Sequence, residues 1–592
     1  MPRRLLPIQS LLLALVVTWP TAWYITRAAV GSAHSDTPKH LWTLWWMRRE
    51  WLDGPWGLQT TLVNAPDGMP LYPIEPLHGL LALLLQIPVV PLSNLLAIAN
   101  VTLVGICTGW LGWLVSRRPA GALVAGALAQ TGSFVAFTLH VGVGELRQVW
   151  WIPLGLGLLL HAQEQRALRW FALLGATLGL ATVSCFYHGF FLGIALAVVA
   201  LCTLRADPAL GRGYALAVGI ALAIIVPIVR TFSHSYAPDD QAVAAVGFLE
   251  WMGTAPPLET YPRSSLEPWQ LVVTRAVDFS HATRQAYAYG GGRYLGWITI
   301  GLAVAGAWQM PRRALPWIAV GLTGIVFAMG TVLWWGDAIV QPRIVLPLAV
   351  LNHALAWFGE PLNFPVRFLA LTTIATSILA ALGTTRRWML ALVPLAMIDV
   401  NRNALAPWPR NMMVMADLSP VEAPEGAVAD FTFALRENVD PLRSYDAADR
   451  FQLLGAQVWL DRPMQIMPVE RVELWGTSGI RWTAALPLAA LVRGASVDED
   501  GVRASTWLLR ERGFRSVVVT HACDANPERG FLRSVSQVLG EPARGRCGLL
   551  WKLPAVEASP AESARWTEEQ ATRLDALQAQ ITTQRGGAPP PP

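Results

Sequence analysis

Long apolar runs separated by short polar turns dominate residues 1–404. A helix needs about 20 mostly apolar residues to cross the hydrocarbon of a bilayer. By this criterion the pattern predicts an α-helical polytopic membrane domain over 1–404 with about 11 transmembrane helices. They lie near residues 7–30, 92–116, 119–139, 149–163, 170–187, 189–204, 213–230, 294–310, 316–335, 366–383 and 388–404.

The arginines predict the orientation of these spans. Positively charged residues stay on the cytoplasmic side, and arginines occur before the first span and then in every second short turn. The N-terminus is therefore expected in the cytoplasm, and an odd number of spans places everything after residue 404 outside. The arginines in question are Arg3, Arg4, Arg117, Arg118, Arg166, Arg169, Arg205, Arg212, Arg312, Arg313, Arg386 and Arg387.

A cleaved signal peptide is the alternative for the first span. Arg3 and Arg4 would be its basic start and Ser32-Ala33 its cleavage site. The apolar stretch is longer than a usual signal core, which favours a membrane anchor.

The pattern changes after residue 404 and predicts a small exported α/β domain over 405–556. Strands are expected at GAVADFTFAL, AQVWLDRPMQI, RSVVVTH and GLLWKL, with helices at WLLRERGF and 527–539. Cys523 and Cys547 fall in this domain, and their pairing is left open. Residues 557–592 are expected to form a polar helix followed by a proline-rich tail.

Composition agrees with a membrane setting and excludes two function classes. Hydrophobic residues make up 53% of the chain and charged residues only 14%, whereas a soluble protein has about 25% charged residues. The net charge of +5 is scattered over short turns, so no nucleic-acid partner is predicted. No GxxxxGK[ST] and no strand-bound GxGxxG occurs, which argues against a nucleotide site. Energy for any reaction must then come with the substrate.

The long external loops are where chemistry is expected, because binding residues concentrate on loops. They cover roughly 31–91, 140–148, 231–293 and 336–365. The first contains SDTPKHLWTLWW, in which an acid, an imidazole and several tryptophans follow one another. Tryptophans favour the membrane surface, so this stretch predicts an aromatic girdle at the headgroup level. The apolar run at 77–90 is too short to span and predicts an interfacial or re-entrant helix.

Asp36 and His40 are the first candidate catalytic residues. Asp36 either acts in catalysis or metal binding, or serves as a structural group just outside a helix cap at Thr37. His40 lies one turn further on the same face if the helix holds. It either acts directly or is a packed hydrogen-bonding residue.

The second external turn, HVGVGELRQ, holds Glu145 and Arg147 between two spans. Charges this close to hydrocarbon are costly and usually pair or function. The two residues either form an ion pair, or Glu145 is a second acid that faces Asp36. A divalent cation between two such carboxylates is left open, and no cofactor is assigned.

Two further polar clusters fall at the same membrane level. Tyr187 and His188 occupy the turn between the fifth and sixth spans, where the structural alternative is a tyrosine anchored at the interface. Glu75 and His78, at the start of the apolar run at 77–90, are a weaker candidate pair.

Asn363 and Arg367 form the last cluster, in NFPVRF. Arg367 opens a span from the outside, against the positive-inside trend. Its guanidinium either binds phosphate oxygens or extends along the apolar surface to reach water.

With these motifs, the chain resembles the type C glycosyltransferase superfamily of polytopic enzymes that use polyprenyl-phosphate-linked sugars. The essential aspartate of the first external loop would be Asp36, followed by PKHLWTLWW as the interfacial helix. Glu145 would be the second acid, and Arg367 in NFPVRF would meet the donor phosphate. LLRERGFRSVVVTH and VLGEPARGRCGLLWKL resemble the exported α/β domains of bacterial members. No WWD-type motif occurs, so N-glycosylation of proteins is not assigned.

The resemblance implies an inverting transfer of a hexosyl or pentosyl group at the outer face of a bacterial inner membrane. The donor would be a lipid-linked sugar, and the acceptor a glycan, lipid or protein among the membrane lipids. Catalysis would rest on Asp36 and His40, and substrate binding on Glu145, Arg147, Tyr187, His188, Asn363 and Arg367. The alternative is a non-catalytic scaffold or lipid-handling protein in envelope assembly. A secondary transporter ranks last, because no sequence repeat occurs.

Overall fold

The structure is a computed structural model of the 592-residue chain. It describes residues 4–31, 37–51, 59–60, 62, 69–70, 75–203, 208–233, 266–272, 292–335, 338–340, 344–354, 362, 364–403, 412–413, 427–430, 458, 466–468, 486–488, 497–520, 536–537, 539–544 and 548–584.

The chain forms two compact units. One consists of Met1–Ser32, Ile74–His78 and Val90–Met412, and we call it the helical unit. The other consists of Ala33–Pro73, Gly79–Val89 and Met413–Pro592, and we call it the sheet unit. The domain boundaries predicted at residues 404 and 556 stay predictions. The sequence gives no sign that the segment 33–73 groups with the C-terminal residues.

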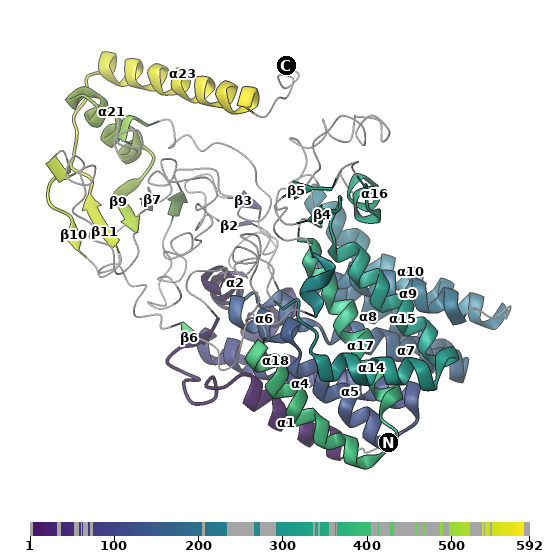
Figure 1. The fold of residues 1–592 in the computed structure, drawn as a ribbon. Helices are drawn as coiled ribbons and strands as arrows, with labels where there is room; N and C mark the ends of the chain where they lie inside the picture. Colours follow the sequence, from purple (N-terminus) through teal and green to yellow (C-terminus); the bar gives the residue numbers. More distant parts are fainter. Residues whose placement is uncertain are drawn as a thin grey trace. The chain divides into compact units, whose positions relative to one another are not determined.

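The helical unit is built from antiparallel apolar helices, which Figure 1 labels. Its elements are α1 (Leu5–Val17), β1 (Ala29–Val30), α4 (Val89–Ser116), α5 (Pro119–Thr131), α6 (Ser133–Val141), η2 (Glu145–Gln148), α7 (Trp151–Gln165), α8 (Leu168–Ser184), α9 (Phe186–Thr203), α10 (Pro208–Ser233), η4 (Pro268–Leu271), α14 (Trp297–Gln309), α15 (Pro311–Ala328), β4 (Trp334–Trp335), β5 (Ala338–Ile339), α16 (Pro347–Ala354), η5 (Pro365–Phe368), α17 (Leu369–Gly383), η6 (Arg387–Ala391) and α18 (Leu392–Asn403).

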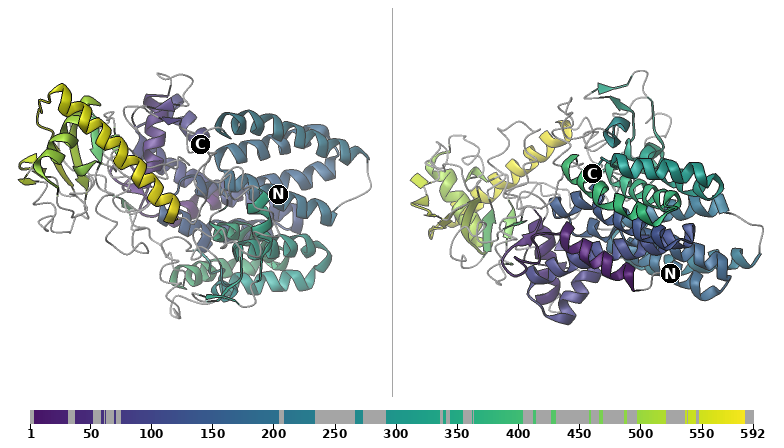
Figure 2. Two further views of the ribbon diagram at one scale, coloured as in Figure 1. Left: turned by 90° about the horizontal axis from the view of Figure 1, so that it is seen from above. Right: turned by 60° about the horizontal axis from the view of Figure 1, so that its bottom comes forward.

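Helix α17 is the centre of this unit. Almost all of its residues are buried, and it packs against α5, α14 and α15. A second group forms around α8, which packs against α7, α9 and α10; these helices run side by side in Figure 2. The α9–α15 contact joins the two groups. A mostly apolar helix that is buried on all sides, as α17 is, is typical of the core of a membrane bundle.

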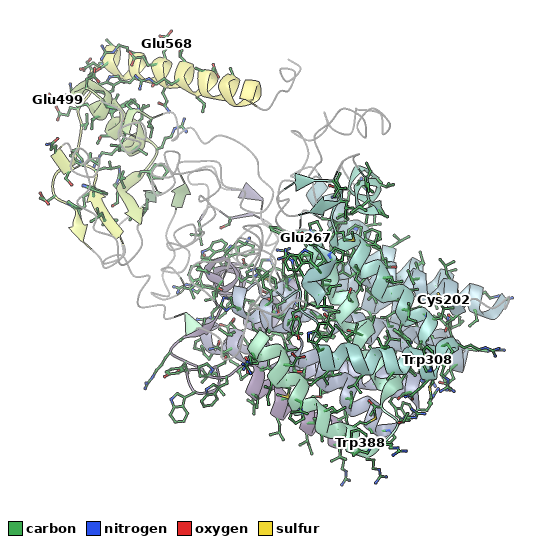
Figure 3. The ribbon with its side chains drawn as sticks, viewed as in Figure 1. Cys202, Glu267, Trp308, Trp388, Glu499 and Glu568 are labelled. Atoms are coloured by element: carbon green, nitrogen blue, oxygen red, sulfur yellow. The ribbon has the colours of Figure 1, made fainter. Side chains whose placement is uncertain are left out.

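Five helices are long and apolar enough to cross a membrane within the described part of the chain. They are Val89–Ser116, Pro119–His140, Phe186–Thr203, Leu210–Arg230 and Pro365–Gly383. Shorter apolar helices cover Leu5–Val17, Leu168–Ser184 and Trp297–Gln309 in the same unit. Large apolar side chains face outward, including Trp308 at 87% exposure and Trp388 at 60%, both at the rim of the unit in Figure 3. Such a surface suits a lipid environment.

A described helix lies in each of the eleven predicted spans, but the count of eleven stays a prediction because five meet the length criterion. The predicted first span at 7–30 is wrong in its extent. Helix α1 ends at Val17, before Pro20, and turns follow. The predicted span at 119–139 is interrupted at Gly132, where extended backbone separates α5 from α6.

The sheet unit contains a five-stranded mixed sheet in the order β10-β11-β9-β7-β8. Strand β7 pairs in parallel with β8 and β9, whereas β11 is antiparallel to β9 and β10. Val517 faces Trp551 in the β9–β11 register, and both side chains are fully buried. The elements are β7 (Ala427–Asp430), β8 (Ile466–Pro468), α21 (Glu499–Glu511), β9 (Phe514–Thr520), β10 (Ala543–Arg544), β11 (Gly548–Lys552) and α23 (Pro560–Gln584), with α2 (Thr37–Arg49), β2 (Gln59–Thr60) and β3 (Met69–Pro70) from the first loop.

Several predicted elements of this unit are confirmed. Helix α21 stops before Gly513, whose φ of 88° suits glycine, and β9 and β11 lie in the predicted strands. Helix α23 matches the predicted polar helix, and α3 (Pro76–Leu85) lies in the predicted short apolar run. The predicted helix at 527–539 falls mostly outside the described residues, as do Cys523 and Cys547.

Candidate active site

The turn between α6 and α7 carries two predicted site residues of the helical unit. Helix α6 ends at Val141, and Gly142 follows with a left-handed backbone at φ 75°. Glycine adopts this conformation without strain, so the chain reverses at once. The 3-10 helix η2 comes next and holds Glu145 half-buried and Arg147 buried.

Arg147 points away from Glu145 and into the protein. Its Nη2 donates a hydrogen bond of 2.8 Å to the carbonyl oxygen of Val30. Burial lowers the pKa of Arg147 to about 10, and the electrostatic attraction of Glu75 acts against that shift. Within the described residues Arg147 forms no ion pair with Glu145, so the structure does not support the ion-pair alternative for these two residues.

Glu75 and His78 form a buried pair that packs against η2 and the glycine before it. His78 Nδ1 lies 2.5 Å from Glu75 Oε2, and Gln148 Nε2 is 3.5 Å from the same nitrogen. The Trp151 indole N–H donates to Gln148 Oε1 at 3.2 Å, which fixes the orientation of that amide. A β-carbon at Gly144 would lie 1.9 Å from Glu75 Oε1, so the carboxylate rests directly on this turn.

Arg367 lies at the start of the α17 span, in the 3-10 helix η5. Pro365 occupies the first turn of η5, where its missing N–H costs nothing. The Arg367 guanidinium carbon lies 4.5 Å from the ring centroid of Tyr187 and 4.2 Å from that of Phe364. The guanidinium is half-buried and, among the described residues, forms no ion pair or hydrogen bond. The rings of Tyr187 and Phe364 fix the position of the guanidinium, whose N–H donors make no hydrogen bond to a described residue.

The break between α8 and α9 faces this arginine. Extended backbone at Cys185 ends α8, and Tyr187 and His188 lie in the first turn of α9. His188 is fully buried and interacts electrostatically with Arg367. Glu145 interacts electrostatically with both Tyr187 and Cys185. The structure thus brings Glu145, Tyr187, His188 and Arg367 together from three separate turns. Their role as a binding site stays a prediction.

Two of the predicted residues, Asp36 and Asn363, lie outside the described residues. His40 lies in α2 of the sheet unit and is buried at 5% exposure, and a direct role for it stays a prediction.

The predicted aromatic girdle at the membrane surface is wrong for its first three tryptophans. Trp42, Trp45 and Trp46 are at most 1% exposed, and the rings of Trp42 and Trp46 stack with centroids 6.2 Å apart. These side chains pack inside the protein, in the part of the first loop that belongs to the sheet unit.

Across the part of the chain that the structure describes, no group of three or more His, Cys, Asp or Glu side chains is arranged to hold a metal ion. The predicted cation site pairs Glu145 with Asp36, and Asp36 is not described. The divalent cation therefore stays a prediction.

Sequence reasoning missed a second charged cluster of the helical unit, between η4 and the start of α14. Glu267, labelled in Figure 3, accepts a hydrogen bond of 3.0 Å from the Trp269 indole N–H and interacts with buried Arg293. Burial lowers the pKa of Arg293 to about 10. These residues are 26 positions apart (293 minus 267) in a long loop without a local motif, so only tertiary structure reveals them.

Sequence reasoning also missed Ser184, Cys185 and Phe364. Their signal was the Ser184-Cys185 pair between two apolar runs and the aromatic residue three positions before Arg367.

No family model and no curated protein matches this sequence. Among solved structures the chain is similar to the oligosaccharyltransferase of Archaeoglobus fulgidus in its apo form, with a TM-score of 0.47, 12% identity, and coverage of 87% of this chain and 69% of the other. A complex of the same archaeal protein with an inhibitory peptide and a dolichol-phosphate gives 0.45 and 13% identity, with coverage of 87% and 69%. The arabinofuranosyltransferase AftD from Mycobacteria gives 0.42 and 14%, covering 94% of this chain and 40% of that one.

These neighbours are an oligosaccharyltransferase and an arabinofuranosyltransferase. TM-scores below 0.5 are too low to assign an activity, so the function below rests on the residues of this chain.

Proposed function

We propose that this chain is a membrane glycosyltransferase that moves a sugar from a polyprenyl-phosphate donor to an acceptor hydroxyl on the outer face of a bacterial inner membrane. The observation that carries the proposal is the state of Arg367. Its guanidinium is clamped between Tyr187 and Phe364, with no carboxylate partner in the described residues. A guanidinium held in this way is suited to a phosphate oxygen pair.

The proposed reaction is a single displacement. Asp36 takes the proton of the acceptor hydroxyl, whose oxygen forms a bond to the anomeric carbon. The bond from that carbon to the phosphate oxygen breaks, and polyprenyl phosphate leaves as an anion that Arg367 stabilises. One displacement inverts the anomeric centre, and no nucleotide is consumed.

The remaining residues would shape the site. Glu145, Tyr187 and His188 line the region around Arg367, and Asn363 would lie beside it. For Arg147 we propose a structural role in place of the substrate contact that the sequence predicts, because it is buried against Val30. The proposed acceptor is a glycan, lipid or protein. In the proposed topology the N-terminus of the chain lies in the cytoplasm and its C-terminal residues lie in the periplasm.

The test uses the purified full chain in lipid nanodiscs, supplied with radiolabelled polyprenyl-phosphate pentoses and hexoses and with envelope glycans as acceptors. Arg367→Gln should lower kcat by about 10²- to 10³-fold, as expected for loss of a donor to a developing anion. Arg367→Lys keeps the positive charge but loses the paired N–H donors of the guanidinium, and should retain only part of the wild-type rate. Asp36→Asn should abolish transfer without affecting membrane insertion.

Arg117→Gln is the matched control. Arg117 pairs with Glu164 at 2.8 Å on the exposed surface, and such pairs contribute little. This variant should keep the wild-type rate. Failure of the wild-type protein to transfer any of these sugars, together with retained assembly of the envelope in cells expressing Asp36→Asn, would favour the scaffold alternative.

A further inference from the structure

The break between α8 and α9 holds two buried polar side chains whose polar atoms make no hydrogen bond to any described residue. Ser184, the last residue of α8, is 2% exposed, and its hydroxyl oxygen has no partner. His188, four residues later, is fully buried, and neither ring nitrogen has one. Both belong to the helical unit.

Such groups are costly in this setting. A buried donor or acceptor without a partner loses its hydration and gains nothing in return. The surroundings of His188 are aromatic, with the Phe191 ring edge-on at 6.2 Å between centroids, so an apolar side chain would pack there at lower cost. A histidine and a serine at this break are therefore explained better by a ligand than by folding.

The hydrogen-bonding chemistry of the two side chains restricts the ligand. A neutral imidazole offers one N–H donor and one lone pair, and a serine hydroxyl both donates and accepts. A phosphate only accepts, so it would leave the imidazole lone pair without a partner. A ligand hydroxyl donates and accepts, and so satisfies both side chains.

Arg367, which interacts electrostatically with His188, supplies only donors and suits the phosphate. The Arg367 guanidinium carbon lies 4.5 Å from the ring centroid of Tyr187, which precedes His188 in the chain, so the partners for a phosphate and for a hydroxyl lie close together.

We propose that Ser184 and His188 form a subsite that binds hydroxyl groups of the transferred sugar and so selects the donor. This inference rests on the proposed function, because it assumes that Arg367 holds the donor phosphate. Asp36 and Arg367 act on the reacting bond, whereas Ser184 and His188 distinguish one sugar from another.

The experiment compares the donor that gives the highest turnover with its single-deoxy analogues. The wild-type protein should discriminate against at least one analogue by kcat/KM, and His188→Phe should lose about tenfold of that discrimination. Ser184→Ala should lose discrimination against the same analogue or one deoxygenated at an adjacent carbon. The donor-free His188→Phe protein should melt at the same temperature as the wild type or higher, because the unpaired imidazole is gone.

Two matched substitutions serve as controls. Ser377→Ala removes a buried hydroxyl that already donates to the Thr373 carbonyl oxygen at 2.8 Å. His161→Phe removes an imidazole that packs against Trp170 in α7–α8, away from the site. Both should keep the wild-type discrimination.

The outcomes separate the two proposals. Absence of transfer by the wild-type chain with every donor would reject the proposed function. Transfer with unchanged discrimination in both His188→Phe and Ser184→Ala would overturn only the sugar subsite, and would assign the two groups to bound water. A fall in the melting temperature of His188→Phe without a change in discrimination would also count against the subsite.

Discussion

Two arginines in turns of the helical unit have different environments, and these decide their roles. Arg147 is buried, donates to the Val30 carbonyl oxygen and faces the charge of Glu75, so its bonding capacity serves the fold. Arg367 is half-buried and is held only by aromatic faces among the described residues. The first is a structural cation, and the second is available to an anion.

Glu75→Gln should destabilise the helical unit by about 3 kcal/mol, because it leaves Arg147 as a buried charge without its counter-charge and weakens the bond to His78. The measurement is the free energy of unfolding in mixed detergent micelles. The double variant Glu75→Gln with Arg147→Met should be less destabilised than the sum of the two single variants. Strict additivity would show that the two charges do not interact.

The sequence predicts residues of this site where a polar group interrupts an apolar run. Arg367 and His188 stand out in this way, and the structure places them near each other. The sequence ranks the Glu75–His78 pair as a weak candidate because Gln148, which contacts His78, is 70 residues further along the chain. The His188 ring makes no hydrogen bond to a described residue, which depends on packing from several helices and cannot be predicted from a local pattern.

At the scale of elements, the contact between α14 and α17 depends on two glycines. A β-carbon at Gly306 would lie 1.9 Å from the Leu379 carbonyl oxygen, and one at Gly383 would lie 2.2 Å from that of Leu302. Small residues let helix backbones approach closely where the surrounding solvent is apolar and gives no hydrophobic drive. Since α17 follows directly on η5, this contact also supports Arg367.

Gly306→Ala should destabilise the protein by about 1–3 kcal/mol, because the two backbones must move apart. Gly301→Ala in the same helix is the control, since no atom lies within 4 Å of the added carbon. The control should be neutral or stabilising by about 0.4–1 kcal/mol through its effect on the unfolded chain. Thermal unfolding of both variants in detergent measures the difference. Equal effects would mean that helix propensity, and not the contact, determines the outcome.

Elements were predictable where one periodic pattern ran without interruption. Helix α23 and strands β9 and β11 follow directly from the sequence. The extent of the first helix was not predictable from hydrophobicity, because the residues after Val17 are apolar but lie in turns around Pro20. The burial of Trp42, Trp45 and Trp46 was missed because tryptophan suits both a membrane surface and a protein core.

At the scale of the whole molecule, the proposed chemistry requires a defined topology. The donor is anchored in the membrane, and the reacting residues must lie on the face where the acceptor is found. The arginine-rich turns predict this topology, while length and apolarity alone identify five spanning helices in the described residues. An independent measurement of sidedness is therefore needed, and the chain offers two exposed positions for it.

Cys202, exposed at the end of α9, is predicted to face the cytoplasm, and Glu568, exposed on α23, the periplasm. Five of the predicted spans lie between them, at 213–230, 294–310, 316–335, 366–383 and 388–404, and an odd number places them on opposite sides. One variant keeps Cys202 as its only cysteine, and a second carries Glu568→Cys alone. A membrane-impermeant maleimide should label the second in intact spheroplasts and the first only after permeabilisation. Labelling of both variants from the same side would require an even number of spans between the two positions. Labelling of both only after permeabilisation would place the C-terminal residues in the cytoplasm.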